Sequence, residues 1–226
     1  MIQRKIMLTG DGSHTILVPE LKETYHSTHG ALRESRHVFI AMGLDHWLTT
    51  NGSGSVRIFE VGFGTGLNAL LSLEYATDQN VKVSYESIEL FPLSVDEVSG
   101  LNYTEMLEKG EMKELFDQLH TSPWEESVPI TPNFELIKRK VALERVEFES
   151  KFDVCFFDAF APSKQPEMWE IPHLQRIYNQ LERGGVYVTY CAKGQLKRDL
   201  REIGFEVETL QGPPGKKEMV RAIKNE

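Results

Sequence analysis

The stretch that decides the fold of this chain lies between residues 58 and 68. It reads Ile58-Phe59-Glu60-Val61-Gly62-Phe63-Gly64-Thr65-Gly66-Leu67-Asn68. The apolar run from Val56 to Val61 predicts a β-strand, and residues 68–75 predict a helix. Three glycines at alternate positions join the two, and glycine adopts positive φ without a steric penalty. The sequence therefore predicts a tight strand-to-helix turn whose backbone a ligand can approach closely.

The spacing of these glycines indicates which class of ligand the turn binds. The dinucleotide-binding fingerprint is G-x-G-x-x-G, and it places a pyrophosphate at the start of the helix. Here the pattern is E-x-G-x-G-x-G, with Glu60 near the end of the strand. A carboxylate in that position repels a pyrophosphate and attracts a cation, such as the ammonium group of an amino acid. The pattern resembles motif I of the S-adenosylmethionine-dependent methyltransferases and disfavours an NAD oxidoreductase.

The composition is that of an ordinary globular protein. The chain has 226 residues, of which 40% are hydrophobic, and this length fits one domain with additions. Its net charge of −9 disfavours broad non-specific binding to nucleic acid, although basic residues concentrate near the C-terminus and allow a local basic face. Cys155 and Cys191 lie in apolar runs, which predicts buried free thiols and fits a reducing cytoplasm. We find no signal peptide, membrane-spanning run or metal-ligand spacing, and expect a cytoplasmic protein without a metal or a membrane partner.

Strand and helix patterns alternate along the chain. Lys5–Leu8 and Thr15–Val18 predict a hairpin, and a helix is expected to begin near Leu32. Further strands are predicted at residues 81–88, 134–138, 153–157, 185–191, 205–210 and 218–223. Helices are predicted at residues 92–109, with a break at Gly100, and at residues 196–203. Residues 110–133 read as an irregular insertion, and residues 183–185 as a turn before the fifth core strand.

This alternation predicts an α/β fold with a mostly parallel, doubly wound, Rossmann-like sheet. We expect an antiparallel strand at its C-terminal end and an N-terminal β-hairpin extension. Residues 1–50 are predicted to form the hairpin and helical extension, and residues 51–226 the methyltransferase domain.

Polar residues follow several of the predicted strands, at the edge where such sheets bind ligands. Glu89 ends the second core strand and is placed to accept the ribose hydroxyls of an adenosine. In S-adenosylmethionine enzymes the turn after the third strand holds the adenine, and here Val141 and Ala142 offer backbone groups. Asp158 ends the fourth strand, where a carboxylate can orient an amine and receive its proton. A role as a turn cap is the alternative for Asp158.

Longer motifs extend the resemblance to one family. They are Glu60–Asn68, Asp158-Ala159-Phe160-Ala161-Pro162-Ser163-Lys164-Gln165-Pro166-Glu167-Met168-Trp169, Lys216-Lys217-Glu218-Met219 and Glu34–Phe39. Together they resemble the methyltransferase half of the tRNA 5-methylaminomethyl-2-thiouridine biosynthesis protein MnmC family. The resemblance implies methylation of the primary amine of 5-aminomethyl-2-thiouridine at the tRNA wobble position, with S-adenosylmethionine as donor. It also implies a stand-alone form without the family's FAD-dependent half, so that separate enzymes supply the aminomethyl precursor.

The resemblance assigns roles to residues at matching positions. Asp158 is the expected catalytic residue. The expected cofactor-binding residues are Glu60, Gly62, Phe63, Gly64, Thr65, Gly66, Asn68, Glu89, Val141 and Ala142. The expected substrate-binding residues are Tyr25, Phe160, Lys164, Lys216 and Lys217, of which the lysines would contact tRNA phosphate. For these lysines, an ordinary solvated surface position is the alternative.

Two other functions are compatible with a fold of this kind. An aminopropyltransferase of the spermidine-synthase type also has an N-terminal hairpin, but it needs an acidic polyamine pocket, and residues 158–169 match it poorly. A non-catalytic RNA-binding module would keep the fold, but the intact glycine turn and Asp158 disfavour a decayed site.

Overall fold

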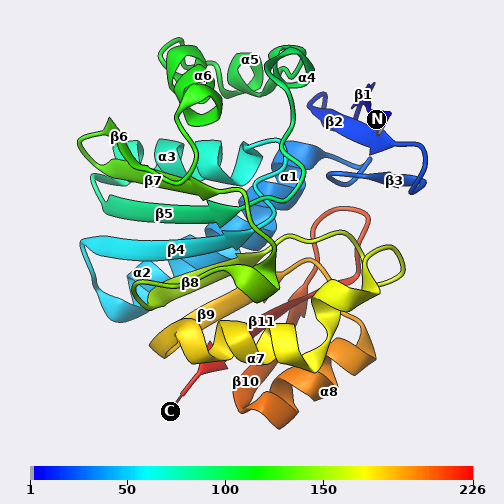
Figure 1. Ribbon diagram of the computed structural model, residues 1–226, viewed down its shortest axis with the longest axis vertical. Helices are drawn as coiled ribbons and strands as arrows, with labels where there is room; N and C mark the ends of the chain where they lie inside the picture. The colour runs from blue at the N-terminus through cyan, green and yellow to red at the C-terminus, as the bar shows by residue number, and fades with distance from the viewer. Residues whose placement is uncertain (1–2, 226) are drawn as a thin grey trace.

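An eight-stranded sheet runs through the middle of the protein (Figure 1). The computed structural model describes residues 3–225. The strand order is β10-β11-β9-β8-β4-β5-β7-β6. These strands are β4 (Ser55–Val61), β5 (Lys82–Ile88), β6 (Ser127–Thr131), β7 (Phe134–Arg139), β8 (Phe152–Phe157), β9 (Leu181–Thr189), β10 (Phe205–Gln211) and β11 (Glu218–Lys224).

The five central strands are parallel, and the chain changes direction at β4. From β4 it crosses to β5 and then β7 on one side, and later to β8 and β9 on the other. Strand β11 pairs antiparallel with β9, and β10 antiparallel with β11. The predicted doubly wound, mostly parallel sheet is therefore confirmed. The carboxyl ends of β4, β5 and β8 meet at one edge, and that edge is the switch point of the topology.

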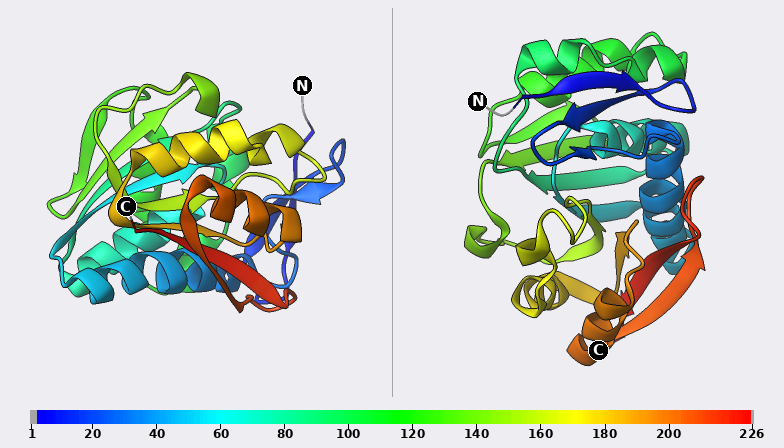
Figure 2. Two further views of the ribbon diagram at one scale, coloured as in Figure 1. Left: turned by 90° about the horizontal axis from the view of Figure 1, so that it is seen from below. Right: turned by 90° about the vertical axis from the view of Figure 1, so that its right-hand side faces the viewer.

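Helices cover both faces of the sheet, as Figure 2 shows. Helix α1 (Ala31–Ser35) continues without a break through the π-helical segment η1 (Arg36–Asp45) into α2 (His46–Asn51). With α3 (Leu67–Gln79) this helix lies on one face, and α7 (Ile171–Gln180) and α8 (Gly194–Ile203) lie on the other. The remaining helical segments are α4 (Val95–Ser99), α5 (Tyr103–Leu107), α6 (Met112–Thr121), η2 (Leu143–Arg145) and η3 (Pro166–Trp169).

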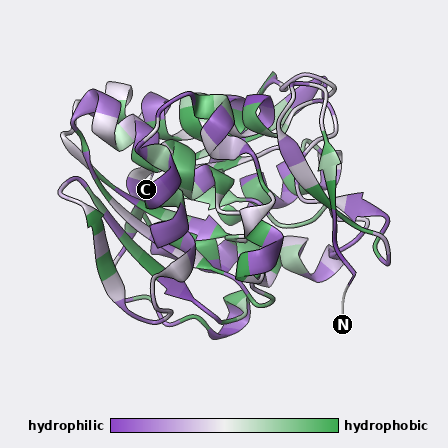
Figure 3. Cartoon of the chain, turned by 90° about the horizontal axis from the view of Figure 1, so that it is seen from above, coloured by the Kyte–Doolittle hydropathy of each residue, from purple (hydrophilic) through white to green (hydrophobic). Residues whose placement is uncertain are grey.

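Two hydrophobic clusters form the core, one on each face of the sheet. Alternate residues of β8 divide between them, with Phe156 facing α1–α3 and Phe157 facing α7 and α8. Hydrophobic residues gather in the strands and on the helix faces turned toward them (Figure 3). The segment predicted as an N-terminal extension contributes Leu32, Phe39 and Leu44 to the first cluster. A domain boundary near residue 50 stays a prediction.

A second, three-stranded sheet stands at the carboxyl edge of the large one (Figure 1). It consists of β1 (Lys5–Leu8), β2 (His14–Val18) and β3 (Glu23–Thr24), all antiparallel. The predicted hairpin is confirmed, and β3 is an addition to it. Because β3 leads directly into residues 25–30, this small sheet delivers that loop to the end of β4.

Two local predictions are wrong. Residues 110–133 are not irregular, since they contain α6, which buries Met112, Phe116 and Leu119, and edge strand β6. Strand β6 contains Pro129, which an edge strand tolerates because one side of its backbone needs no partner. Residues 183–185 do not precede the fifth core strand but lie within β9. Its register with β8 shifts there, and Gly184 has a φ of 75°.

Both cysteines, Cys155 and Cys191, are buried and free, as predicted. Among residues 3–225, the helices are too short or too polar for any of them to cross a membrane.

The packing of η1 on the sheet gives a testable prediction. A Cβ at Gly43 would lie 2.9 Å from Val188 Cγ2 and 3.2 Å from Phe156 Cε1. We expect Gly43→Val to lower the free energy of unfolding by about 1–3 kcal/mol through overpacking, measured by urea denaturation. The control is Gly54→Val, because a Cβ at Gly54 meets no atom within 4 Å. Equal urea midpoints for the two variants would contradict close packing of η1.

Candidate functional site

The glycine turn joins the end of β4 to the start of α3 in a left-handed conformation. The φ angles of Gly62, Gly64 and Gly66 are 93°, 50° and 72°. The N–H groups of Gly62 and Phe63 both donate to Ile88 O, at 3.0 and 3.1 Å. The turn is therefore tied to the end of the neighbouring strand β5, and residues with a Cβ would be strained at these three positions.

Neighbouring groups approach the same glycines so closely that side chains are excluded. A Cβ at Gly62 would lie 3.0 Å from Asp158 O, and one at Gly64 would lie 3.0 Å from the Tyr25 ring. At Gly66 it would lie 2.6 Å from His120 Nε2. The turn thus brings together three segments that lie far apart in the sequence.

One amide group links two of the predicted site carboxylates. Asn68 Nδ2 donates to Glu60 Oε1 at 3.0 Å and to Asp158 Oδ2 at 2.9 Å. Glu60 is fully buried, and its Oε2 accepts a hydrogen bond from Ser87 Oγ at 2.7 Å. Asp158 N–H donates to Val61 O at 3.0 Å, which fixes the end of β8 against the end of β4. The structure therefore brings Glu60, Asn68 and Asp158 into one cluster beside the glycine turn.

Burial changes the charge of this cluster. The pKa of Glu60 is raised to about 8, chiefly by loss of solvation and also by the nearby Asp158, against the hydrogen bonds from Ser87 and Asn68. Loss of solvation likewise raises the pKa of Asp158 to about 7. A carboxylate that titrates near pH 7 can both accept and return a proton, which suits a general base.

Glu89 stands where it was predicted, at the end of β5. Its Oε2 accepts the Gly64 N–H at 3.0 Å, and its Oε1 accepts the Phe91 N–H at 2.8 Å. The Glu89 N–H donates to Arg139 O at 3.0 Å and so joins the ends of β5 and β7. Val141 and Ala142 follow β7 at the same edge, two strands away from β4.

Aromatic side chains cover the glycine turn. The Tyr25 ring lies over Gly64 and meets Phe160 edge to face, with the ring centroids 5.2 Å apart. Phe160 is held in turn by Trp169, whose Nε1 donates to Phe160 O at 2.8 Å. This contact explains why the motif beginning at Asp158 extends as far as Trp169.

The segment misread as irregular supports the turn from the other side. His120 Nε2 lies 3.1 Å from Thr65 O, and its ring packs on Phe63 with centroids 5.2 Å apart. Trp124 also contacts Phe63, and the Lys138 ammonium lies 4.9 Å from the Trp124 ring. Sequence reasoning missed this role, since nothing local to residues 120–124 marks a contact with the turn.

Two further polar residues were also missed. His26 is buried, and its Nε2 lies 2.7 Å from Thr65 Oγ1. Ser87, which binds Glu60, is the direct neighbour of Glu60 in the pairing of β4 with β5. A serine two residues before a strand-end acid is the sequence signal that could have identified it.

The predicted phosphate-binding lysines occupy different environments. Lys164 is half-buried on the turn after β8, and Lys217 is exposed on the loop between β10 and β11. Lys216, on the same loop, points inward and pairs with Glu34.

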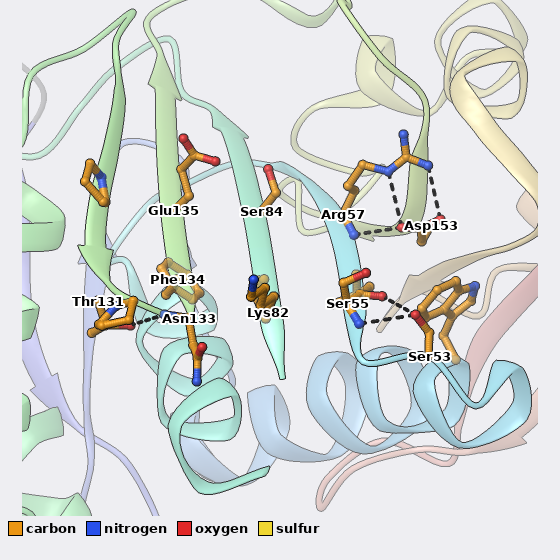
Figure 4. Close-up of a pocket in the computed structure, with 15 residues that line it drawn as sticks. Ser53, Ser55, Arg57, Lys82, Ser84, Thr131, Asn133, Phe134, Glu135 and Asp153 are labelled. Atoms are coloured by element: carbon orange, nitrogen blue, oxygen red, sulfur yellow. Dashed lines mark hydrogen bonds and ion pairs between the residues drawn. The ribbon is translucent and has the colours of Figure 1, made fainter. Parts of the chain in front are cut away.

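A separate hollow of about 650 Å³ opens at the opposite edge of the sheet, near the amino ends of β4, β5 and β7 (Figure 4). Polar side chains in this hollow accept hydrogen bonds from backbone groups beside them: the Arg57 backbone N–H donates to Asp153 Oδ2 at 2.8 Å, and the Ser55 backbone N–H to Ser53 Oγ at 3.2 Å. Parallel sheets bind ligands at the other edge. We assign no function to this hollow.

Comparison with known proteins agrees with this geometry. A family model described as S-adenosyl-L-methionine-dependent methyltransferase matches residues 112–225, slightly more than half of the chain. The chain is 32% identical over 227 residues to the tRNA 5-methylaminomethyl-2-thiouridine biosynthesis bifunctional protein MnmC of Leptospira borgpetersenii. It is 29% identical to the MnmC protein of Idiomarina loihiensis. The matches cover 95% and 88% of this chain but only 34% and 35% of the relatives, so the chain spans about a third of their length.

A solved structure is similar over the whole chain. The crystal structure of MNMC2 from Aquifex aeolicus superposes with a TM-score of 0.80 and 26% sequence identity, covering 100% of this chain and 72% of that one. The resemblance predicted from the sequence is confirmed, and the chain belongs to the S-adenosyl-L-methionine-dependent methyltransferase family.

Proposed function

We propose that this protein transfers a methyl group from S-adenosylmethionine to the primary amine of 5-aminomethyl-2-thiouridine at the wobble position of tRNA. The observation that carries the proposal is the Asp158 carboxyl group, held beside the glycine turn by Asn68 and shifted to a pKa of about 7. The similarity to MnmC proteins supplies the substrate class. The aminomethyl precursor would come from separate enzymes, and the proposed place of action is the cytoplasm.

The residues around the turn fit the cofactor. Asn68 Oδ1 is a buried acceptor without a hydrogen-bond partner, and together with Glu60 it suits an amino-acid ammonium group. Glycines 62, 64 and 66 let a ligand lie against the backbone, and Phe63 and Thr65 hold the turn in shape. Glu89 would accept the ribose hydroxyls, and backbone groups of Val141 and Ala142 would contact the adenine.

Methyl transfer to an amine requires a base that is positioned beside the nitrogen. S-adenosylmethionine supplies a methyl group whose bond to sulfur breaks as the lone pair of the amine nitrogen attacks its carbon. Asp158 orients the amine and accepts the proton that must leave before nitrogen can act as the nucleophile. Its half-buried position and its bond to Asn68 fix that acceptor in place. Positioning of this kind supplies most of the rate when the donor is already activated.

Aromatic rings and basic groups at the edge suit a nucleotide. Tyr25 and Phe160 form the wall on the substrate side, where a uridine base can stack. Lys164 and Lys217 are the proposed contacts for tRNA phosphate, and Lys216 joins them only if it leaves Glu34. The methyltransferase family model favours methyl transfer over aminopropyl transfer.

The proposed function predicts a specific product. Purified protein, labelled S-adenosylmethionine and tRNA from cells that cannot complete the modification should yield 5-methylaminomethyl-2-thiouridine, identified by nucleoside analysis. Fully modified tRNA from normal cells is the control and should accept no label. Label in any other nucleoside would show that the proposed substrate is wrong.

Asp158→Asn keeps the size of the side chain and an acceptor for Asn68, but it cannot take a proton at neutral pH. We expect kcat to fall about 10²–10⁴-fold while the dissociation constant of S-adenosylmethionine stays the same. The wild-type rate should rise with pH up to about 7, because Asp158 must be ionised to act. The rate of the variant should not show this rise. Asp153→Asn, at the other end of β8, is the control. If cofactor affinity fell as much as the rate, Asp158 would be a cofactor-binding residue.

Glu60 gives a prediction that does not depend on turnover. Because its pKa is raised to about 8, it is mostly protonated at pH 7, and a bound ammonium group would favour its ionised form. Binding of S-adenosylmethionine should therefore release up to about one proton, measured by calorimetry in buffers of different ionisation enthalpy. Glu60→Gln should remove most of this release. Glu86→Gln, which changes a buried carboxylate paired with Arg139, should not. Unchanged release in Glu60→Gln would place the ammonium elsewhere.

A further inference from the structure

A partly buried ion pair lies beside the site, and this pairing has no role in the steps above. The Lys216 ammonium contacts Glu34 Oε1 and lies 3.8 Å from the centroid of the Tyr190 ring. Glu34 is 5% exposed, and its second oxygen accepts the Ser27 N–H at 2.7 Å. A carboxylate and an aromatic face therefore surround one alkylammonium group.

The Tyr190 ring that faces this ion pair lies at the same strand ends as Asp158. Strands β8 and β9 are parallel neighbours, with Phe156 opposite Val188. Asp158 and Tyr190 each follow two residues later, so they stand side by side, and Tyr190 Oη donates to Ala159 O at 2.8 Å. The charges of Glu34 and Lys216 also reach Asp158, because Glu34 raises the pKa of Asp158 and Lys216 lowers it. The pair is thus within electrostatic range of the proposed base.

The loop that carries Lys216 is fixed, whereas its side chain reaches the solvent. The Gly212 N–H donates to Lys217 O at 3.1 Å and the Lys216 N–H to Pro213 O at 2.9 Å. A Cβ at Gly215, where φ is 86°, would collide with the His29 ring. The Lys216 side chain itself is 31% exposed. Rotation of that side chain can therefore vacate the position between Glu34 and Tyr190 while the backbone stays in place.

We propose that Glu34 and Tyr190 form the subsite for the primary ammonium group of the substrate, and that Lys216 fills this subsite until the substrate displaces it. The inference rests on the proposed function, because an aminomethyl group is a primary alkylammonium ion like the lysine side chain. A buried carboxylate together with an aromatic face is a general way to bind such an ion. Glu34 then holds the substrate amine next to Asp158, which takes its proton, and the displaced Lys216 is free to reach tRNA phosphate.

The first test measures the subsite directly and requires no turnover. Propylammonium ion is titrated into Lys216→Ala by calorimetry. We expect saturable binding to this variant and none to the wild-type protein or to Lys216→Ala combined with Glu34→Gln. Lys109→Ala is the matched control, because it removes a lysine that pairs with Glu74 and Asp78 at 3.2 and 2.7 Å on another part of the surface. Absence of binding to Lys216→Ala, or equal binding to Lys109→Ala, overturns the subsite.

The second test connects the subsite to the substrate. We expect Glu34→Gln to raise the KM for tRNA about tenfold or more, with the cofactor affinity unchanged, since it removes a charged partner of the ammonium. In Lys216→Ala, propylammonium should inhibit methyl transfer competitively with tRNA. An unchanged KM in Glu34→Gln, or inhibition that tRNA does not relieve, overturns the assignment. Circular dichroism of each variant checks that it is folded. If the wild-type protein transfers no methyl group to tRNA, the proposed function fails, and the calorimetric test still decides whether the ammonium subsite exists.

Discussion

The site depends on a single amide nitrogen that donates to two carboxyl groups at once. Asn68 Nδ2 binds Glu60 on one side and Asp158 on the other, at 3.0 and 2.9 Å. Two buried carboxylates repel each other unless a donor or a proton lies between them. The amide provides the donor, and burial raises the pKa of both acids, which favours their protonated forms. This arrangement forms only where the end of β4, the start of α3 and the end of β8 converge.

Uncharged histidine side chains hold the glycine turn in place. His26 and His120 contact the side chain and the carbonyl of Thr65, and burial lowers the pKa of each to about 4. Both histidines are therefore uncharged at neutral pH and act as fixed hydrogen-bonding groups. The loop after β3 supplies His26, and α6, between β5 and β7, supplies His120. The loop after β3 and helix α6 thus hold the glycine turn with two uncharged side chains.

Charge on the substrate side is arranged differently. Glu34 is buried, and its partner is the ammonium group of Lys216. Removing one member of a buried pair is costly, so an alkylammonium that replaces the lysine avoids leaving Glu34 unpaired. Exchange of one ammonium group for another therefore costs less free energy than leaving the Glu34 carboxylate buried without a partner. Lys216 points inward to Glu34, whereas Lys217 on the same loop is exposed.

The sequence by itself determined the strand-turn-helix unit around the three glycines, the glycine conformation and the strand-end positions of Glu60, Glu89 and Asp158. These features are local, because apolar periodicity and the absence of a Cβ act over a few residues. Tertiary structure alone decided that His120 supports Thr65, 55 residues away, and that Lys216 pairs with Glu34 across 182 residues. It also turned residues 110–133 into a helix and an edge strand. Such contacts depend on how the helices and loops pack on the sheet, and a short stretch of sequence does not predict that packing.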